Sequence, residues 1–180
     1  MQTYPVHLVQ QLTLKDGTPI TIRPIRPQDA RIEQEFVRNL SDESRYYRFM
    51  DSVRELSPQM LLHFTHVDYD RHMALIAVIE RNGNEIQVGV ARYVTEPNGR
   101  RCEFAIAVAD EARRKGLGTH LLQALMAAAR AAGLDVMYGD VLASNHRMLR
   151  LMAKLGFSAR FDENDSRLVR VETNLRKRDG

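Results

Sequence analysis

Hydrophobic and polar positions form regular blocks along the chain, and the spacing within each block predicts a mixture of strands and helices. Strands are predicted where apolar residues alternate or run continuously, at 12–14, 20–25, 73–79, 86–94, 101–109, 136–142, 157 onward and 167–173. Asp16-Gly17 separates the first two segments and is typical of a hairpin turn. Residues 1–10 show no clear pattern, so we expect a loosely held lead-in there.

Helices are predicted between these segments from apolar spacing and from capping residues. The predicted helices cover about 29–40, 41–49, 58–66, 116–132 and the stretch after Ser144-Asn145. Ser57-Pro58 places a capping residue before proline at the first helical position. Leu121, Leu125 and Ala132 belong to an apolar stripe at helical spacing. The order of elements predicts an α/β fold with a mixed sheet wrapped by helices and no regular βαβ period.

Composition narrows the class of protein. The 180 residues carry a formal charge of +3 and contain no long Lys/Arg block, which argues against a nucleic-acid partner. No repeat or linker divides the chain, so we expect one domain over 1–180 with a core of about 12–175. Cys102 is the single cysteine and fits a reducing compartment. Without a leader or a membrane-length apolar run, we expect a cytoplasmic protein that makes no membrane contact.

The strand at 101–109 and the turn that follows it hold the most informative residues. Gly116 and Gly118 open a helix whose first N–H groups have no partner within the helix, and an anion can dock there. Arg113, Arg114 and Lys115 add positive charge just before it. This spacing matches neither a P-loop nor a dinucleotide fingerprint.

The two faces of the 101–109 strand differ in size. Cys102 and Phe104 begin a bulky face, whereas the other face is small except for Glu103. The small face is either the wall of a cleft for a slender ligand or the seat of a closely packed helix, and the alternation does not decide between them. We interpret Cys102 as a buried hydrophobic residue rather than a nucleophile.

Three motifs follow one another along the chain, namely Arg113-Arg114-Lys115-Gly116-Leu117-Gly118, then Asn145, then Leu155-Gly156-Phe157. In this order they resemble the GNAT superfamily of N-acetyltransferases, and the resemblance covers about residues 20–173. A closer resemblance is to the acetyltransferase domain of bacterial Pat-type protein lysine acetyltransferases. The segments that carry it are 22–29, 44–49, 68–71 and Glu103-Phe104-Ala105. The resemblance implies a mixed, mostly antiparallel central sheet and acetyl transfer from acetyl-CoA to an amine. No metal is expected, because the spacing of His63 and His66, or of Asp68, Asp70 and His72, matches no strong metal motif.

The resemblance also implies roles for particular residues. Glu103 matches the general base, although an ion pair with Arg92 or Arg101 is the structural alternative. Asn145 is either an ordinary helix cap or a contact to the cofactor arm, and the two roles are compatible. The residues implied in binding acetyl-CoA are Ile106, Ala107, Val108, Arg113, Arg114, Lys115, Gly116, Leu117, Gly118, Thr119 and Asn145.

Other features leave alternatives open. Many family members have Tyr at the position of Met152, where it protonates the leaving thiolate, and a thioether cannot do so. Tyr46, Tyr47 and Phe49 belong either to the core or to the acceptor entrance. The acceptor implied is a protein lysine, for example on an acyl-CoA synthetase. The alternatives are a small-molecule amine, or a non-catalytic acyl-CoA-binding sensor. The protein is expected to be a monomer or a homodimer.

Overall fold

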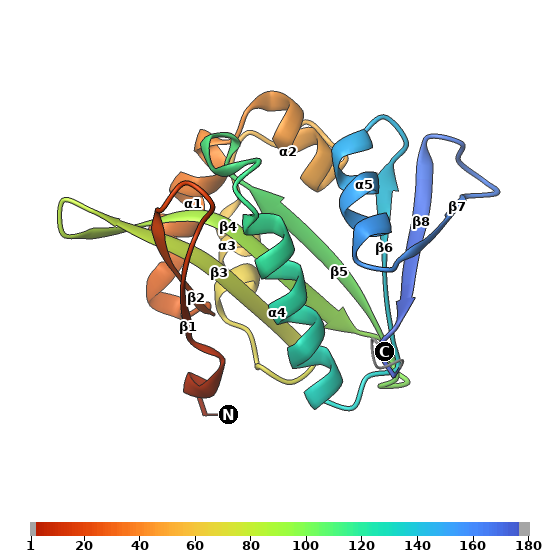
Figure 1. The fold of residues 1–180 in the computed structure, drawn as a ribbon, viewed down its shortest axis with the longest axis horizontal. Coiled ribbons are helices and arrows are strands. Elements are labelled where there is room, and N and C mark those ends of the chain that lie inside the picture. The colour runs from red at the N-terminus through yellow and green to blue at the C-terminus, as the bar shows by residue number, and fades with distance from the viewer. Residues whose placement is uncertain (1–2, 177–180) are drawn as a thin grey trace.

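A computed structural model of the chain describes residues 3–176, which build one eight-stranded sheet with the order β1-β2-β3-β4-β5-β6-β8-β7 (Figure 1). The strands are β1 (Gln10–Thr13), β2 (Pro19–Pro24), β3 (His72–Arg81), β4 (Asn84–Thr95), β5 (Arg101–Val108), β6 (Val136–Leu142), β7 (Ser158–Phe161) and β8 (Leu168–Asn174). Only β5 and β6 pair in parallel within the described residues, and every other neighbouring pair is antiparallel. The predicted mixed, mostly antiparallel sheet is confirmed.

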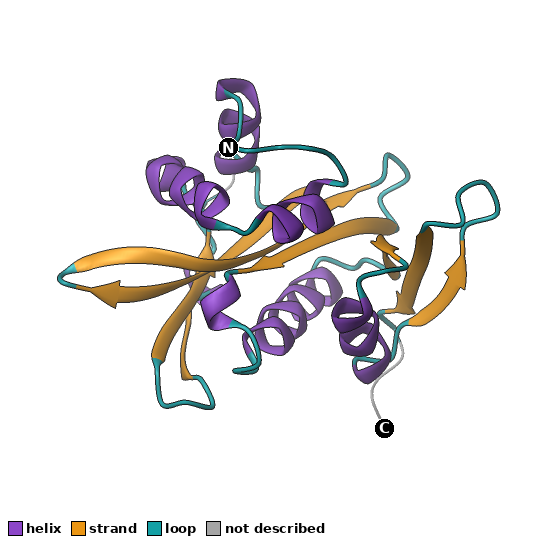
Figure 2. Cartoon of the chain, turned by 90° about the horizontal axis from the view of Figure 1, so that it is seen from above, coloured by secondary structure: helices purple, strands orange, loops and turns teal. Residues whose placement is uncertain are grey.

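Within residues 3–176, five α-helices cover the two faces of this sheet. They are α1 (Ala30–Asn39), α2 (Asp42–Phe49), α3 (Pro58–Thr65), α4 (Leu117–Ala131) and α5 (His146–Lys154). Figures 1 and 2 together show α1, α2 and α3 on one side of the strands and α4 and α5 on the other. No helix in the described part of the chain has both the length and the apolar character needed to cross a membrane.

The helix boundaries follow the predicted capping residues. Ser57 accepts a hydrogen bond from the backbone N–H of Met60 at 3.2 Å and begins α3 at Pro58. Helix α4 buries the predicted leucines, but it ends at Ala131, so Ala132 is an exposed cap rather than part of the buried stripe. The predicted elements are otherwise present, with small shifts at their ends.

The N-terminal segment differs from the sequence-based expectation. The hydroxyl of Tyr4 donates a hydrogen bond to the carbonyl of Pro24 at 2.8 Å, and its ring packs edge-on against Tyr69. A short 3-10 helix at Val6–Leu8 then leads into β1. The prediction of a loose lead-in is therefore wrong for residues 3–10, because a tertiary hydrogen bond and an aromatic contact hold a segment that has no local pattern.

Strands β5 and β6 pair over only a short stretch. Their register runs from Arg101 opposite Val136 to Glu103 opposite Tyr138, and it stops there. Figure 1 shows the two strands meeting at one end of the sheet and separating toward α2 and α5. Beyond Glu103, the edge of β5 that faces β6 therefore has no strand partner, although β4 remains paired along the opposite edge.

Candidate active site

A cavity of about 690 Å³ opens where β5 and β6 separate. Its walls come from β5, α2, the loop between β5 and α4, and the first turns of α4 and α5. Every predicted site residue except Lys115 lines it, namely Glu103, Ile106, Ala107, Val108, Arg113, Arg114, Gly116, Leu117, Gly118, Thr119 and Asn145. The structure thus brings together residues that span more than forty positions of the sequence.

The face of β5 that carries the small residues Ala105 and Ala107 is directed toward α2. Arg92 lies opposite Ala105 in the antiparallel ladder, so the two side chains share a face of the sheet. Ala105 and Ala107 both line the cavity, as do Ser44 and Tyr47 of α2. The structure therefore supports the prediction that the small face of β5 is the wall of a cleft, rather than the seat of a closely packed helix.

The loop before α4 presents backbone N–H groups to the cavity. Gly116 is the N-cap of α4 with φ +86°, and no side chain caps this end of the helix. Arg114 also has a positive φ, of 63°. Consecutive N–H groups in such a turn form a concave anion site, and the N-terminal end of the helix dipole adds to its positive potential. The loop therefore fits a diphosphate group.

Lys115 is placed differently from its neighbours. Its ammonium group pairs with Asp16 at 3.0 Å, in the turn between β1 and β2, and its carbonyl accepts a hydrogen bond from the Lys15 backbone. The side chain of Lys15 lines the cavity instead. The hairpin turn thus supports the loop and supplies a cation that the sequence reasoning missed.

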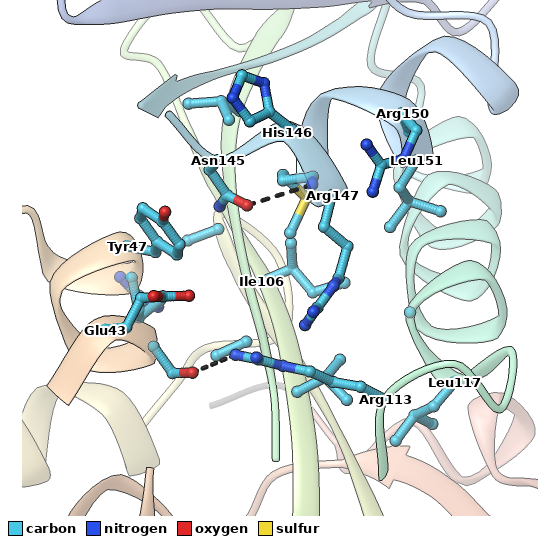
Figure 3. A pocket seen from close by; sticks show the side chains of 18 of the residues that line it. Glu43, Tyr47, Ile106, Arg113, Leu117, Asn145, His146, Arg147, Arg150 and Leu151 are labelled. Carbon is cyan, nitrogen blue, oxygen red and sulfur yellow. Dashed lines mark hydrogen bonds between the residues drawn. The ribbon is translucent and has the colours of Figure 1, made fainter. Parts of the chain in front are cut away.

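Positive charge gathers at this end of the cavity. Figure 3 shows Arg113, from the loop, and Arg147, from α5, projecting into the same space. Arg114, Arg147 and Arg150 make no ion pair with any residue between 3 and 176, so they are available to an anionic ligand.

Arg113 has a partner within the protein. Its guanidinium pairs with Asp110 at 2.9 Å and also donates to the hydroxyl of Ser44 on α2. Asp110 further accepts hydrogen bonds from the Ser41 backbone at 2.9 Å and the Ser44 hydroxyl at 2.8 Å. Burial alone would raise the pKa of Asp110, but these hydrogen bonds and Arg113 hold it below its ordinary value. Asp110 thereby connects the start of α2 to the loop at residues 113–119, which we call the anion loop.

Glu103 lies at the point where β5 leaves β6. Its side chain is exposed to the cavity, and no residue in the described part of the chain pairs with it or donates a hydrogen bond to it. The two arginines named as alternative partners are engaged elsewhere, Arg92 with Glu33 at 3.3 Å and Arg101 with Glu172 at 2.8 Å. The carboxylate is thus free to accept a proton or to bind a cation.

Two further carboxylates line the same cavity. Asp140 is paired with Arg170 at 2.7 Å, which leaves it less available than Glu103. Glu43 projects from α2, where it is exposed (Figure 3). Glu43 is therefore the second candidate base that an experiment has to separate from Glu103.

Asn145 is a helix cap. Its side-chain oxygen accepts from the backbone N–H of Met148 at 3.3 Å, as the dashed line in Figure 3 shows. The same side chain lines the cavity, so the predicted cofactor contact remains compatible with the cap. Met152, which stands where many family members have Tyr, is 1% exposed and packs in the core, away from the cavity.

Other reactive residues have structural roles. Cys102 is fully buried, and burial raises the pKa of its thiol to about 12, so it is protonated at neutral pH. Asp68 Oδ1 accepts backbone hydrogen bonds from Asp70, Arg71 and His72, each at 2.9 Å. Within residues 3–176, no group of three or more His, Cys, Asp or Glu side chains is arranged to hold a metal ion.

Helix α2 and the start of α5 supply further lining residues. The sequence reasoning left Tyr47 and Phe49 open between the core and the acceptor entrance, and it missed Arg48, His146, Arg147 and Arg150. Tyr47, Arg48 and Phe49 of α2 line the cavity, whereas Tyr46 is 42% exposed on the outside. His146, Arg147 and Arg150 line it from α5. The two arginines are three residues apart and follow the capping Asn145. A basic first turn is unfavourable for the helix dipole, and this was the signal in the sequence.

Comparisons with known proteins agree with this geometry. The model of the acetyltransferase (GNAT) family matches residues 35–157. An acetyltransferase from Pseudomonas aeruginosa is 34% identical over 157 residues, which are 87% of this chain and 84% of that protein. Acetyltransferase Pat from Mycolicibacterium smegmatis is 30% identical over 144 residues, which are 79% of this chain but only 42% of that protein.

The fold is also similar to a solved structure. The crystal structure of the GNAT domain of PAT from S. lividans superimposes with a TM-score of 0.86 and 28% identity, covering 96% of this chain and 99% of that chain. With the family model, the relatives and the cavity taken together, this chain belongs to the GNAT acetyltransferase family and is an acetyl-CoA-dependent acyltransferase related to the Pat type.

Proposed function

We propose that this protein transfers the acetyl group of acetyl-CoA to the side-chain amine of a protein lysine, with Glu103 as the general base. The observation that carries this proposal is the unpaired carboxylate of Glu103, in a cavity whose other end is an anion-binding loop. The loop residues 113–119 and the cations of Lys15, Arg147 and Arg150 suit the phosphate groups of the co-substrate.

The free edge of β5 suits the extended arm of the co-substrate. An extended chain can add to an unpaired strand edge through main-chain hydrogen bonds. Ile106, Ala107 and Val108 provide that edge between the anion loop and Glu103. A backbone N–H in this stretch would also stabilise the oxyanion that forms at the thioester carbonyl.

The chemistry requires a neutral amine, because a free lysine is protonated at neutral pH, with a pKa near 10.4. Glu103 removes a proton from the nitrogen, directly or through one water. The nitrogen lone pair forms the new C–N bond at the thioester carbon, and the positively charged nitrogen of the adduct releases its second proton to solvent. The oxyanion then collapses as the C–S bond breaks. The thiolate leaves with the bonding electron pair and takes a proton from solvent, because the buried Met152 offers none.

The acceptor is proposed to be a protein, such as an acyl-CoA synthetase, because of the Pat-type relatives and the surface beside the cavity. Met50, at the end of α2, lines the cavity and is 36% exposed. Tyr46 on the same helix is 42% exposed. We propose that Met50, at the edge of the cavity, contacts the acceptor protein. The catalytic unit is proposed to be a single domain over 1–180 that acts as a monomer or homodimer.

The test is acetyl-CoA turnover against a panel of protein and small-amine acceptors, followed by thiol release and mass spectrometry. Glu103→Gln should lower turnover by roughly 10²-fold near neutral pH while acetyl-CoA affinity changes little. Glu43→Gln discriminates between the two free carboxylates, and Glu111→Gln, which lies outside the cavity, controls for the loss of a surface charge.

The outcomes separate the alternatives. One dominant acetylated lysine on a synthetase, with Glu103→Gln inactive, supports the proposal. Faster turnover of a small amine reassigns the acceptor. A large loss in Glu43→Gln with none in Glu103→Gln reassigns the base. Tight acetyl-CoA binding without transfer to any amine would leave a non-catalytic sensor.

A further inference from the structure

Arg48 lines the cavity and lies beside two aromatic rings. Its Cζ atom is 4.7 Å from the centre of the Phe49 ring and 5.7 Å from that of Phe64. These two rings are nearly parallel, with an interplanar angle of 10°. A guanidinium that rests on aromatic faces is held in a fixed orientation with its N–H donors directed sideways. Arg48 is thus a prearranged set of donors in the wall of the cavity.

The charge of Arg48 has no counter-ion in the described part of the chain. Arg48 donates no hydrogen bond to any residue between 3 and 176 and forms no ion pair there. The neighbouring carboxylate of Glu33 is already engaged, since it pairs with Arg92 at 3.3 Å and accepts from Gln87 at 2.6 Å. A partly buried guanidinium without an anion is unfavourable, so a carboxylate arriving from outside would be bound strongly.

Electrostatics agree with this geometry. Burial and the nearby charge of Arg92 lower the pKa of Arg48 to about 10, so it stays protonated at neutral pH. Glu33 and Glu103 are the acidic groups close enough to act on it, and of these only Glu103 is unpaired. Arg48 and Glu103 therefore lie near one another in the cavity, and neither has an ion-pair partner among the described residues.

The part of the cavity that holds Arg48 and Glu103 is distinct from the anion loop. Arg92, which acts on Arg48, is registered opposite Ala105, two residues from Glu103. The anion loop begins beyond Val108, five strand residues from Glu103, which corresponds to about 16 Å along the strand. The cations that suit phosphate groups all come from the loop, the first hairpin turn and α5. Arg48 is therefore placed to bind the acceptor and not the phosphates.

We infer that Arg48 is a specificity-determining residue that binds a carboxylate on the acceptor while Glu103 faces the acceptor amine. The inference rests on the proposed function and specifies its substrate class, an amine that carries a nearby carboxylate. That carboxylate comes from one of two sources. It belongs to an acidic side chain beside the target lysine of a protein, or to a free amino acid.

The wild-type protein tests this directly with matched acceptors. One arm compares lysine peptides that have Glu or Asp beside the lysine with the same peptides carrying Gln or Asn. The other arm compares amino acids of increasing chain length with their primary amides. Binding to the CoA-loaded protein by calorimetry and kcat/KM are both measured, so recognition is read even where transfer is slow. We expect the carboxylate form to be favoured by at least about tenfold in one arm.

Three variants assign the preference to this residue. Arg48→Gln should reduce the carboxylate-to-amide ratio of kcat/KM to about one, mainly by raising the KM of the carboxylate acceptor, while the affinity for acetyl-CoA stays near wild type. Arg48→Lys keeps the charge and should restore part of the ratio. Arg54→Gln is the matched control, because Arg54 is exposed and lies outside the cavity.

Two results would overturn the inference. One is a wild-type protein that acetylates amines but does not distinguish acid from amide in either arm. The other is an unchanged ratio in folded Arg48→Gln. If Arg48→Gln fails to fold, the first result still tests the inference, because it requires only the wild-type protein. A protein that transfers acetyl to no amine contradicts the proposed function instead, and calorimetry still decides whether a carboxylate is bound.

Discussion

A charge introduced at Gly118 tests the anion loop most directly. An ideal Cβ at this position would lie 3.2 Å from Leu151 Cδ2 and 3.9 Å from Val108 Cγ2. Both neighbours line the cavity, so a longer side chain at 118 must extend into it or displace Leu151. Gly118→Glu therefore places a carboxylate where the phosphates of acetyl-CoA are expected. Gly118→Gln has nearly the same size and shape without the charge.

The magnitude follows from Coulomb's law. Two like charges about 5 Å apart repel by roughly 2–3 kcal/mol at an effective dielectric constant of 20–40. Screening at an exposed cavity mouth reduces this to about 1–2 kcal/mol, which is roughly 5- to 30-fold in affinity. We expect Gly118→Gln to bind acetyl-CoA more weakly than wild type because of its bulk. Gly118→Glu should be weaker by that further factor, for a total loss of at least about tenfold.

The assay is calorimetric titration of acetyl-CoA at low and at high ionic strength, with thermal melting to verify that each variant folds. Position 118 is in the first turn of α4, where a glutamate favours the helix dipole, so the charge itself should not hinder folding. The difference between Glu and Gln should shrink as salt is added. Equal affinity of the two variants at low salt would refute the placement of the phosphates at this loop.

Two further predictions concern the residues that support the site. Asp110→Ala removes the acceptor for the Ser41 and Ser44 hydrogen bonds and should cost about 1–3 kcal/mol of unfolding free energy, with a raised KM for acetyl-CoA. If Asp110→Ala kept the wild-type KM for acetyl-CoA, the hydrogen bonds between Asp110 and α2 would not contribute to positioning the loop. His72 is buried against Arg92, and burial lowers its pKa from 6.5 to about 4. The folded state resists protonation of His72, so wild-type stability should fall by about 3 kcal/mol between pH 6.5 and 4 relative to His72→Gln. If the unfolding free energies of wild type and His72→Gln changed by the same amount over this pH range, the prediction would be contradicted.

The local elements were predictable because their causes are local. Asp16-Gly17 fixed a hairpin, Ser57-Pro58 began a helix, and Gly116 opened α4 with its first N–H groups uncapped. The ordered motifs around Gly118, Asn145 and Gly156 identified the family. Most of the predicted site residues are contiguous on β5 and the following loop, so one short segment already contained the proposed base and the proposed anion-binding loop.

The sequence could not show which charges are satisfied. Lys115 forms an ion pair with Asp16, and Arg113 forms one with Asp110. Arg147 and Arg48 line the cavity from two helices that are far apart in the sequence. Each of these outcomes depends on which segments become neighbours, and no local pattern encodes that.

The sequence by itself determined the strands, the helices, the anion loop and the family, because these follow from periodicity, capping and motif order within short stretches. The tertiary structure alone decided that β5 separates from β6 after Glu103, and that α2 forms one wall of the cavity. It also decided that Arg48 remains without a counter-ion while Arg92 takes Glu33. The physical reason is that ion pairing and strand separation are contacts between segments far apart in the chain, and their free energies are defined only once the packed sheet fixes their distances.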